Sequence, residues 1–343
     1  MIRTLTFCLV FFFLLTSCNS DKKLLHIYIW GDFVKQKLIE RFENEHNCRV
    51  VIDTYDSNES MYAKLKSGAS GYDLIFPSGY ILQVMEHQNM LQPLDKSLIP
   101  NLKNLDFTLL DILNEAPHEH SVPYAITYTA IGYRKDKVKD LVPSWNVFTR
   151  SDLKGRMTML NDMREVLGAS LLVNGFSINT TEKQELDTSV LDVIKWKKNL
   201  AKFESEQYKN GIASAEYLVV QGYSSDIMQI SDEEPNVVLS LPSEGGIFSC
   251  DYVTIPKDAS ELELAHAFIN FLLLPDVAAE NMEANFYLSP NKPAFDLLSD
   301  ELRANPALFP PREFLEKSES IQDLGGNIRL YIDAWEEIKA SRA

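Results

Sequence analysis

Cysteine is scarce in this chain, and its scarcity excludes a fold built on disulfide bonds. Only 4 of the 343 residues are cysteine, whereas small disulfide-framed domains carry many closely spaced cysteines. Cys8 and Cys18 lie near the N-terminus, so Cys48 and Cys250 are the only thiols in the body. These two are far apart in the sequence, and we expect both to be reduced and packed in the interior.

Apolar runs long enough to cross a membrane are also lacking. The longest run, 5–15, follows Arg3 and is shorter than the roughly 20 residues that a spanning helix needs. It has the charged start and small-residue end of a secretory signal peptide. Cys18 directly follows Leu-Thr-Ser, which resembles a bacterial lipoprotein signal. We therefore predict lipidation at Cys18, with a plain signal peptide or a buried helix as alternatives.

Basic residues are too few for a nucleic-acid-binding surface. Lys and Arg number 33 against 49 Asp and Glu, a formal charge of −16. Without residues 1–17, which carry only Arg3, the remaining 326 residues have a charge of −17. Phosphate binding requires a basic patch, so we expect no nucleic-acid partner, and the acidic balance is compatible with a small cation. A body of this length normally forms two domains.

Short catalytic motifs are absent as well. The chain has no Gly-x-Ser-x-Gly elbow, phosphate-binding glycine loop or His-Glu-x-x-His helix, which are typical of hydrolases, nucleotide-binding enzymes and metalloproteases. The segment 118–120, His-Glu-His, lies between two prolines in a polar stretch, and we interpret it as a solvated loop. We expect a protein that is not an enzyme and needs no metal or cofactor.

What the sequence does contain is an alternation of strand and helix patterns. Short β-rich runs alternate with amphipathic segments, which is typical of parallel strands joined by crossover helices, the α/β class. Expected strands are 26–30, 49–55, 72–76, 157–160 and 217–221. Expected helices are 34–45, 58–66, 164–174, 190–200, 262–273 and one around 328–335. No linker separates two halves, so we expect the chain to pass between two lobes more than once.

Aromatic and acidic residues lie at the ends of these expected strands. They are Trp30, Phe33, Ser78, Tyr80, Asp162, Glu165, Asp251 after the run 247–250, and Tyr287. In open α/β sheets ligands bind outside the carboxyl ends of strands, and aromatic faces with carboxylates suit an organic ammonium. Other roles remain open: Asp162 and Glu165 fit a helix capping box, the aromatic residues fit core packing, and Asp251 fits a turn.

Several segments resemble the spermidine/putrescine-binding proteins of bacterial ABC importers. They are TYDSNESMYAKLKSG (54–68), YDLIFPSGY (72–80), MREV (163–166), EGGIF (244–248) and FINFLLLPDVA (268–278). The resemblance implies a two-lobed α/β binding protein, type II-like, with mainly parallel sheets and a ligand cleft between the lobes. It places lobe 1 at 25–130 plus 252–297 and lobe 2 at 131–251 plus 298–343, after a tether at 18–24.

The resemblance also implies the residues of the cleft. The strand-end residues above match ligand-binding positions of the family, although tyrosine is commoner at the Phe33 position. A family glutamine aligns near Ile321-Gln322, and we assign it to Gln322. Two departures stand out, because Gln221 and Ser249 occupy positions where the family has tryptophan. Tyr223, two residues after Gln221, can reach the same face and partly replace one lost ring.

The expected function is therefore that of a substrate-binding lipoprotein of an ABC importer. It would capture spermidine or putrescine, deliver it to a membrane permease, and work as a lipid-anchored monomer in the periplasm or on the outer face of the cytoplasmic membrane. The replacements at Gln221 and Ser249 leave a different small cationic solute as the alternative. A sensory or adhesive lipoprotein that has lost transport is a further alternative.

Overall fold

The computed structural model describes residues 22–31, 33–55, 57–113 and 119–342. The expected signal peptide and Cys18 lie outside the described residues, as does His118. Of the His-Glu-His segment, the described His120 lies beside Glu86, with 3.3 Å between Nδ1 and Oε1. Within the described part of the chain, no group of three or more His, Cys, Asp or Glu side chains is placed to hold a metal ion.

Ten strands and fourteen α-helices make up the described chain. The strands are β1 (Lys23–Trp30), β2 (Cys48–Tyr55), β3 (Leu74–Ile75), β4 (Ser121–Arg134), β5 (Met157–Met159), β6 (Leu200–Phe203), β7 (Val219–Tyr223), β8 (Val237–Ser240), β9 (Ile247–Thr254) and β10 (Glu319–Ser320). The helices are α1 (Gln36–His46), α2 (Asn58–Lys66), α3 (Gly79–His87), α4 (Thr108–Ile112), α5 (Met163–Val173), α6 (Lys183–Lys197), α7 (Tyr208–Ala213), α8 (Ser224–Glu233), α9 (Leu262–Leu272), α10 (Pro275–Asn285), α11 (Lys292–Phe295), α12 (Asp300–Arg303), α13 (Arg312–Leu315) and α14 (Ile328–Ala340). Five short 3-10 helices lie between them.

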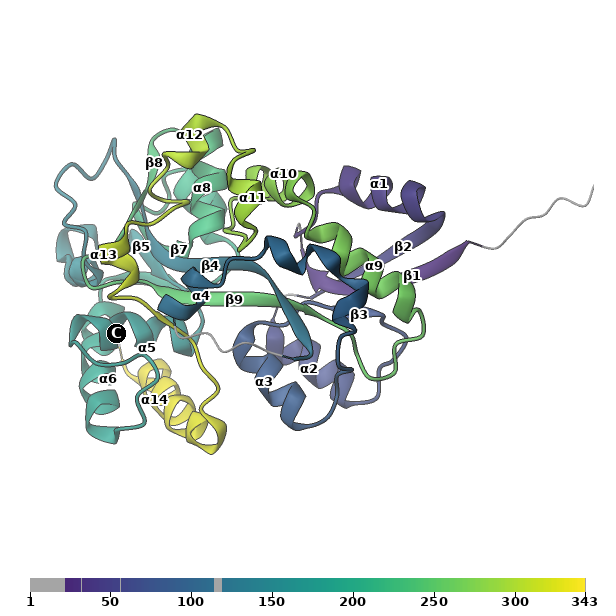
Figure 1. Ribbon diagram of the computed structural model, residues 1–343. Coiled ribbons are helices and arrows are strands. Elements are labelled where there is room, and N and C mark those ends of the chain that lie inside the picture. Colours follow the sequence, from purple (N-terminus) through teal and green to yellow (C-terminus); the bar gives the residue numbers. More distant parts are fainter. Residues whose placement is uncertain (1–21, 32, 56, 114–118, 343) are drawn as a thin grey trace, which may run out of the picture.

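Two long antiparallel strands, β4 and β9, join two groups of parallel strands (Figure 1). The sheet order is β2-β1-β3-β9-β4-β7-β5-β6, with β10 beside β9 and β8 beside β4. Strands β1, β2 and β3 pair in parallel, as do β5, β6 and β7. β4 pairs with β9 along its first half and with β7 and β8 along its second. The mainly parallel α/β class is confirmed.

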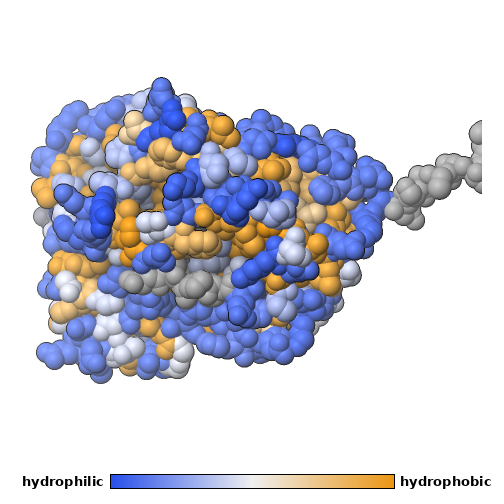
Figure 2. All heavy atoms as spheres, viewed as in Figure 1, coloured by the Kyte–Doolittle hydropathy of each residue, from blue (hydrophilic) through white to orange (hydrophobic). Residues whose placement is uncertain are grey.

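Each group of parallel strands has its own apolar core. We call the part around β1–β3 lobe 1, whose core includes Leu25, Phe42 and Phe268. The part around β5–β7 is lobe 2, whose core includes Trp145 and Trp196. A third cluster follows β4 and β9 between them, and in Figure 2 hydrophilic residues cover most of the rim of the face shown. The residue limits of the two lobes stay a prediction.

Local sequence signals account for many helix ends. Ser57 caps α2 by accepting a hydrogen bond from the Ser60 amide at 3.2 Å, as expected for a serine at this position. Gly68 follows with φ +97°, a conformation that favours glycine at a helix end. The helix expected at 262–273 agrees with α9, which ends at Leu272. Pro275 then begins α10, because the first turn of a helix needs no N–H donor.

The interior also accounts for the thiols and for the most apolar helices. Cys48 and Cys250 are both buried thiols outside any disulfide, which confirms the prediction for them, and burial raises the pKa of the Cys48 thiol. Among the described helices none is by itself long and apolar enough to span a membrane. Only α9 and α10 together reach that length, and they are bent by 71° relative to one another.

Candidate functional site

The ends of β1 and β2 place two aromatic rings side by side in lobe 1. Trp30 and Tyr55 are register partners at the carboxyl ends of the two parallel strands, and their ring centroids are 4.5 Å apart. Tyr55 is buried and donates a hydrogen bond from its hydroxyl to the Phe76 carbonyl at 2.5 Å. Tyr55 was not predicted as a site residue, although the strand-end rule that indicated Trp30 applies to it equally.

Ser78 and Asp251 meet beside these rings. The Ser78 hydroxyl donates to Asp251 Oδ1 at 2.5 Å and accepts from Asn58 Nδ2 at 2.9 Å. The expectation that Asp251 ends a strand is wrong, because β9 continues to Thr254. A buried carboxylate is tolerated within the strand because Ser78 satisfies it. Burial raises the pKa of Tyr55, and the Asp251 charge raises it further, so the Tyr55 phenol lies near this carboxylate.

Tyr80 connects the two lobes. It lies in the first turn of α3 in lobe 1, yet its ring packs against the lobe 2 core as well as the cluster along β4 and β9. Its hydroxyl donates to Glu59 Oε1 at 3.0 Å. Burial, and then the charges of Glu59 and Asp162, hold the pKa of Tyr80 well above its usual range. Glu59 was missed from the sequence, where it is an ordinary acidic residue in the first turn of a helix.

The two acids of lobe 2 are held at the N-terminus of α5. Asp162 Oδ1 accepts from the amides of Arg164 at 2.8 Å and Glu165 at 3.2 Å, so the capping interpretation of Asp162 is confirmed. Glu165 does not complete the capping box. Its Oε2 accepts instead from Thr129 Oγ1 of β4 at 2.8 Å. Carboxylates at this end of a helix are favoured by the helix dipole.

Burial disfavours the charged forms of Asp162 and Glu165. It raises the pKa of Asp162, and it raises the pKa of Glu165 well above the usual range, with the Asp162 charge adding to the rise. Arg164 lies next to both acids, but its guanidinium nitrogens bind the Gln322 carbonyl and Asn179. The acids are therefore left without a side-chain cation bound to them in the described structure, which is the charge deficit that an ammonium ligand can fill.

Gln221, where the family has tryptophan, is part of the support of α5. It is fully buried, its Nε2 donates to the Glu165 carbonyl at 2.9 Å, and its Oε1 accepts from the Leu160 amide at 3.4 Å. Tyr223 ends β7 on the same strand face. Burial raises the pKa of Tyr223, and the charges of Asp162 and Glu165 raise it further, so its phenol lies near both acids.

Two further predicted residues, Ser249 and Gln322, have different surroundings. Ser249 is half-buried and pairs with Thr127 across β4 and β9. Strand alternation places it on the Asp251 face, while Phe248 and Cys250 lie in the cluster along these strands. Gln322 is half-buried, and its backbone is hydrogen bonded to Asn179 and Arg164. Within the described residues, no hydrogen bond joins the Gln322 side chain to the acids.

Phe33 and Tyr287 lie deeper in lobe 1, in an aromatic cluster. Their ring centroids are 5.4 Å apart, and Phe76 and Tyr124 complete the cluster. Tyr287 is buried and its hydroxyl donates to the Tyr124 hydroxyl at 2.6 Å. Both residues pack in the core of lobe 1, and a role in contacting a ligand stays a prediction for both.

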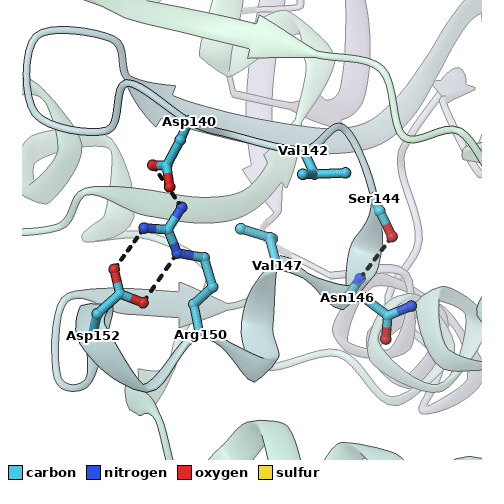
Figure 3. A pocket seen from close by; sticks show the side chains of 7 residues that line it. All are labelled: Asp140, Val142, Ser144, Asn146, Val147, Arg150 and Asp152. Atoms are coloured by element: carbon cyan, nitrogen blue, oxygen red, sulfur yellow. Dashed lines mark hydrogen bonds and ion pairs between the residues drawn. The ribbon is translucent and has the colours of Figure 1, made fainter.

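A separate surface groove in lobe 2 contains no predicted site residue (Figure 3). Arg150 lies in this groove between Asp140 and Asp152, at 3.0 and 2.5 Å. Both carboxylates pair with the guanidinium, so the groove lacks the charge deficit found at α5.

The fold and the site are those expected of a solute-binding protein: two lobes are joined by shared strands, and Tyr80 of lobe 1 lies near Asp162 of lobe 2. A family model for bacterial extracellular solute-binding proteins matches residues 37–310. The chain is 34% identical to the spermidine/putrescine-binding periplasmic protein of Salmonella typhimurium, over 94% of this chain and 93% of the relative. It is 32% identical to the putrescine-binding periplasmic protein PotF of Escherichia coli, with coverage of 94% and 93%.

Solved structures of similar proteins support the same family. A putative spermidine/putrescine ABC transporter protein from Listeria monocytogenes superposes with a TM-score of 0.86 at 31% identity, covering 94% of this chain and all of that chain. The TpPotD lipoprotein of Treponema pallidum gives 0.84 at 33% identity, with coverage of 92% and 99%. The chain belongs to the spermidine/putrescine-binding family of bacterial extracellular solute-binding proteins, which are transporter components and not enzymes.

Proposed function

We propose that this protein is the substrate-binding component of an ABC importer and binds a polyamine, spermidine or putrescine, between its two lobes. The observation that carries the proposal is the pairing of buried acids with aromatic rings across the lobes. Asp162 and Glu165 lie in lobe 2, and Tyr80 of lobe 1 packs against the lobe 2 core near Asp162. The names of the related proteins support the same ligand class.

The site separates the two requirements of a polyamine. An ammonium group needs carboxylate acceptors, which Asp162 and Glu165 supply at one end and Asp251 at the other. The methylene groups need apolar surface, and aromatic faces also attract a cation. Trp30 and Tyr80 supply these faces. Binding of the ligand would bring the missing positive charge to the acids.

The lobe limits proposed from the family are 25–130 plus 252–297 and 131–251 plus 298–343. They put the aromatic residues, Trp30 and Tyr80, in lobe 1. They put the three acids in lobe 2, on the opposite side of one hinge. β4 and β9 are the strands that cross between the lobes. Hinge closure around a ligand is the usual movement of such proteins. The Ser78–Asp251 hydrogen bond joins a lobe 1 loop to β9 close to this crossing.

We further propose that Cys18 is the lipid anchor and that the protein works as a monomer in the periplasm or on the outer face of the cytoplasmic membrane. The lipoprotein signal pattern and the lipoprotein from Treponema pallidum support the anchor. A permease in the same membrane is the expected partner.

A second candidate, another small cationic solute, is favoured by two observations. Gln221 occupies a position where the family has tryptophan, and it is hydrogen bonded to α5. This position therefore supplies no aromatic ring to the ligand. The indole N–H of Trp30 is buried and has no hydrogen-bond partner in the described structure. A polyamine that is fully protonated offers no acceptor to that donor, whereas an amine that carries an oxygen does.

Isothermal titration of residues 19–343 with putrescine, spermidine, cadaverine and agmatine tests the proposal. We expect heat of binding with at least one of the first two. Folded protein that binds none of these amines contradicts the polyamine function. Titration with ethanolamine, a cation that carries a hydroxyl oxygen, tests the second candidate, and a melting temperature raised by that compound alone would favour it.

A further inference from the structure

Arg164 lies between the two acids of lobe 2 but is bound to other groups. Its Nη1 donates to the Gln322 carbonyl at 3.0 Å, and its Nη2 donates to Asn179 Oδ1 at 2.6 Å and to the Ile178 carbonyl at 3.3 Å. The side chain is buried, and its guanidinium carbon lies 4.7 Å from the centre of the Tyr331 ring. The arginine therefore joins the start of α5 to the loop that carries Gln322.

Asn179 completes this connection. Its Oδ1 accepts from the Gln322 amide at 2.9 Å as well as from Arg164, and its Nδ2 donates to the Ser320 carbonyl at 2.9 Å. Tyr331 of α14 in turn donates to the Ile178 carbonyl at 2.8 Å. Three segments that are distant in the sequence thus meet at one guanidinium: the first turn of α5, the loop after α5, and the loop after β10.

The partners of Arg164 are neutral, which distinguishes it from Arg150. Arg150 pairs with two exposed carboxylates in the surface groove of lobe 2 (Figure 3). Arg164 instead binds carbonyl and amide oxygens in the interior, where the flat, forked guanidinium can hold several acceptors at fixed angles. An interior arginine of this kind positions the neighbouring loop through its hydrogen bonds.

We propose that Arg164 is a positioning residue of the ligand site: its hydrogen bonds hold the loop that carries Gln322, a predicted ligand residue, against the start of α5, which carries Asp162 and Glu165. The inference rests on the proposed function. Without the guanidinium, the loop must be ordered when the ligand binds, and that ordering lowers the affinity.

The test is a double-mutant cycle with titration of putrescine or spermidine, whichever binds the wild type. R164K should weaken binding by about tenfold, within the range found for coupled neighbours. Lysine keeps the positive charge but cannot hold the Gln322 carbonyl and Asn179 together. In a Q322A background the same R164K change should alter affinity by less than about twofold. R150K is the matched control and should leave binding unchanged.

Asn179→Ala provides a second variant, in case R164K does not fold, and it should behave in the same way. Hydrogen exchange adds a ligand-free measurement, since the Gln322 amide should exchange faster in R164K and N179A than in wild type. Wild-type affinity in both variants overturns the inference, and so does an equal loss with and without Gln322. A wild type that binds no amine contradicts the proposed function itself, and the inference then falls with it.

Discussion

The two sides of the proposed cleft are built by different means. On the lobe 1 side, Trp30, Tyr55 and Tyr80 are held by ring packing and by hydroxyl groups that donate to neighbouring oxygens. On the lobe 2 side, Asp162 and Glu165 are held by the amides that begin α5 and by Thr129. The aromatic side is stable without a ligand, because its polar groups largely have partners within the protein.

The acidic side is not satisfied in the same way. Asp162 and the buried Glu165 lie close together, and burial and then the Asp162 charge disfavour the charged form of Glu165. This arrangement costs stability in the empty protein, and a bound cation removes the cost. The comparison indicates that lobe 1 contributes contact surface while lobe 2 contributes most of the charge, and the following predictions test that division in order of decreasing effect.

The largest effect is expected for Glu165→Gln. The substitution removes a buried negative charge that a bound ammonium would neutralise, and loss of one partner of such a pair costs about 2–3 kcal/mol of binding free energy. The melting temperature of the empty protein should rise or stay constant, because the charged form of Glu165 is disfavoured there and glutamine carries no charge. Calorimetry and thermal unfolding measure both. Asp152→Asn, in the surface groove, is the control and should change neither affinity nor its pH dependence.

Asp251→Asn should have the next largest effect. It keeps the shape of the side chain and can still accept from Ser78, so stability should change little, while affinity should fall by more than about 1.4 kcal/mol. Titration with the preferred amine measures the loss. If the melting temperature falls and the affinity does not, Asp251 is structural and the charge in this site comes from Asp162 and Glu165 alone.

Binding should also depend on pH in a defined direction. Because the pKa of Glu165 is raised well above its usual value, between the two values the folded empty protein holds a proton that the unfolded chain has lost. Stability of the empty protein therefore falls as pH rises through this window. A cation favours the carboxylate, so its affinity should rise over the same window, with proton release.

Titrations at several pH values, in two buffers of different ionisation enthalpy, measure this proton release. Glu165→Gln should remove most of it, while the pH dependence should survive in Asp152→Asn. An affinity that is constant from pH 5 to pH 8 would contradict a protonated acid in the empty site.

Trp30→Leu tests the aromatic side. It removes a ring face but keeps an apolar side chain, so affinity should fall by about 0.5–2 kcal/mol. The loss should be similar for putrescine and cadaverine, which carry the same charge. A loss greater than that of Glu165→Gln would reverse the proposed division between the two lobes.

The smallest effect is expected for Asp162→Ser. Serine also caps a helix, so unfolding free energy should change by less than about 0.5 kcal/mol. Affinity should fall about threefold, since half-buried Asp162 already shares one oxygen with two amides and contributes to binding mainly by its charge. Unchanged affinity would show that capping is the whole role of Asp162.

Local features of this protein were predictable from the sequence, and contacts between distant residues were not. The expected helices at 58–66 and 164–174 agree with α2 and α5 within a residue, because periodicity and capping depend on neighbours in the chain. Glu59 and Thr129 were missed, because nothing near them in the sequence distinguishes them. Thr129 reaches Glu165 across 36 positions, and Ser78 reaches Asp251 across 173.

The amino-acid sequence by itself determined the α/β class, the capped start of α5 and the presence of acids and aromatic residues at strand ends. All of these follow from interactions within a few residues. Only the tertiary structure decided that Asp251 lies within β9, that Gln221 supports α5, and that Arg164 binds the Gln322 loop. The physical reason is that hydrogen bonds between segments depend on how β4 and β9 bring the two lobes together.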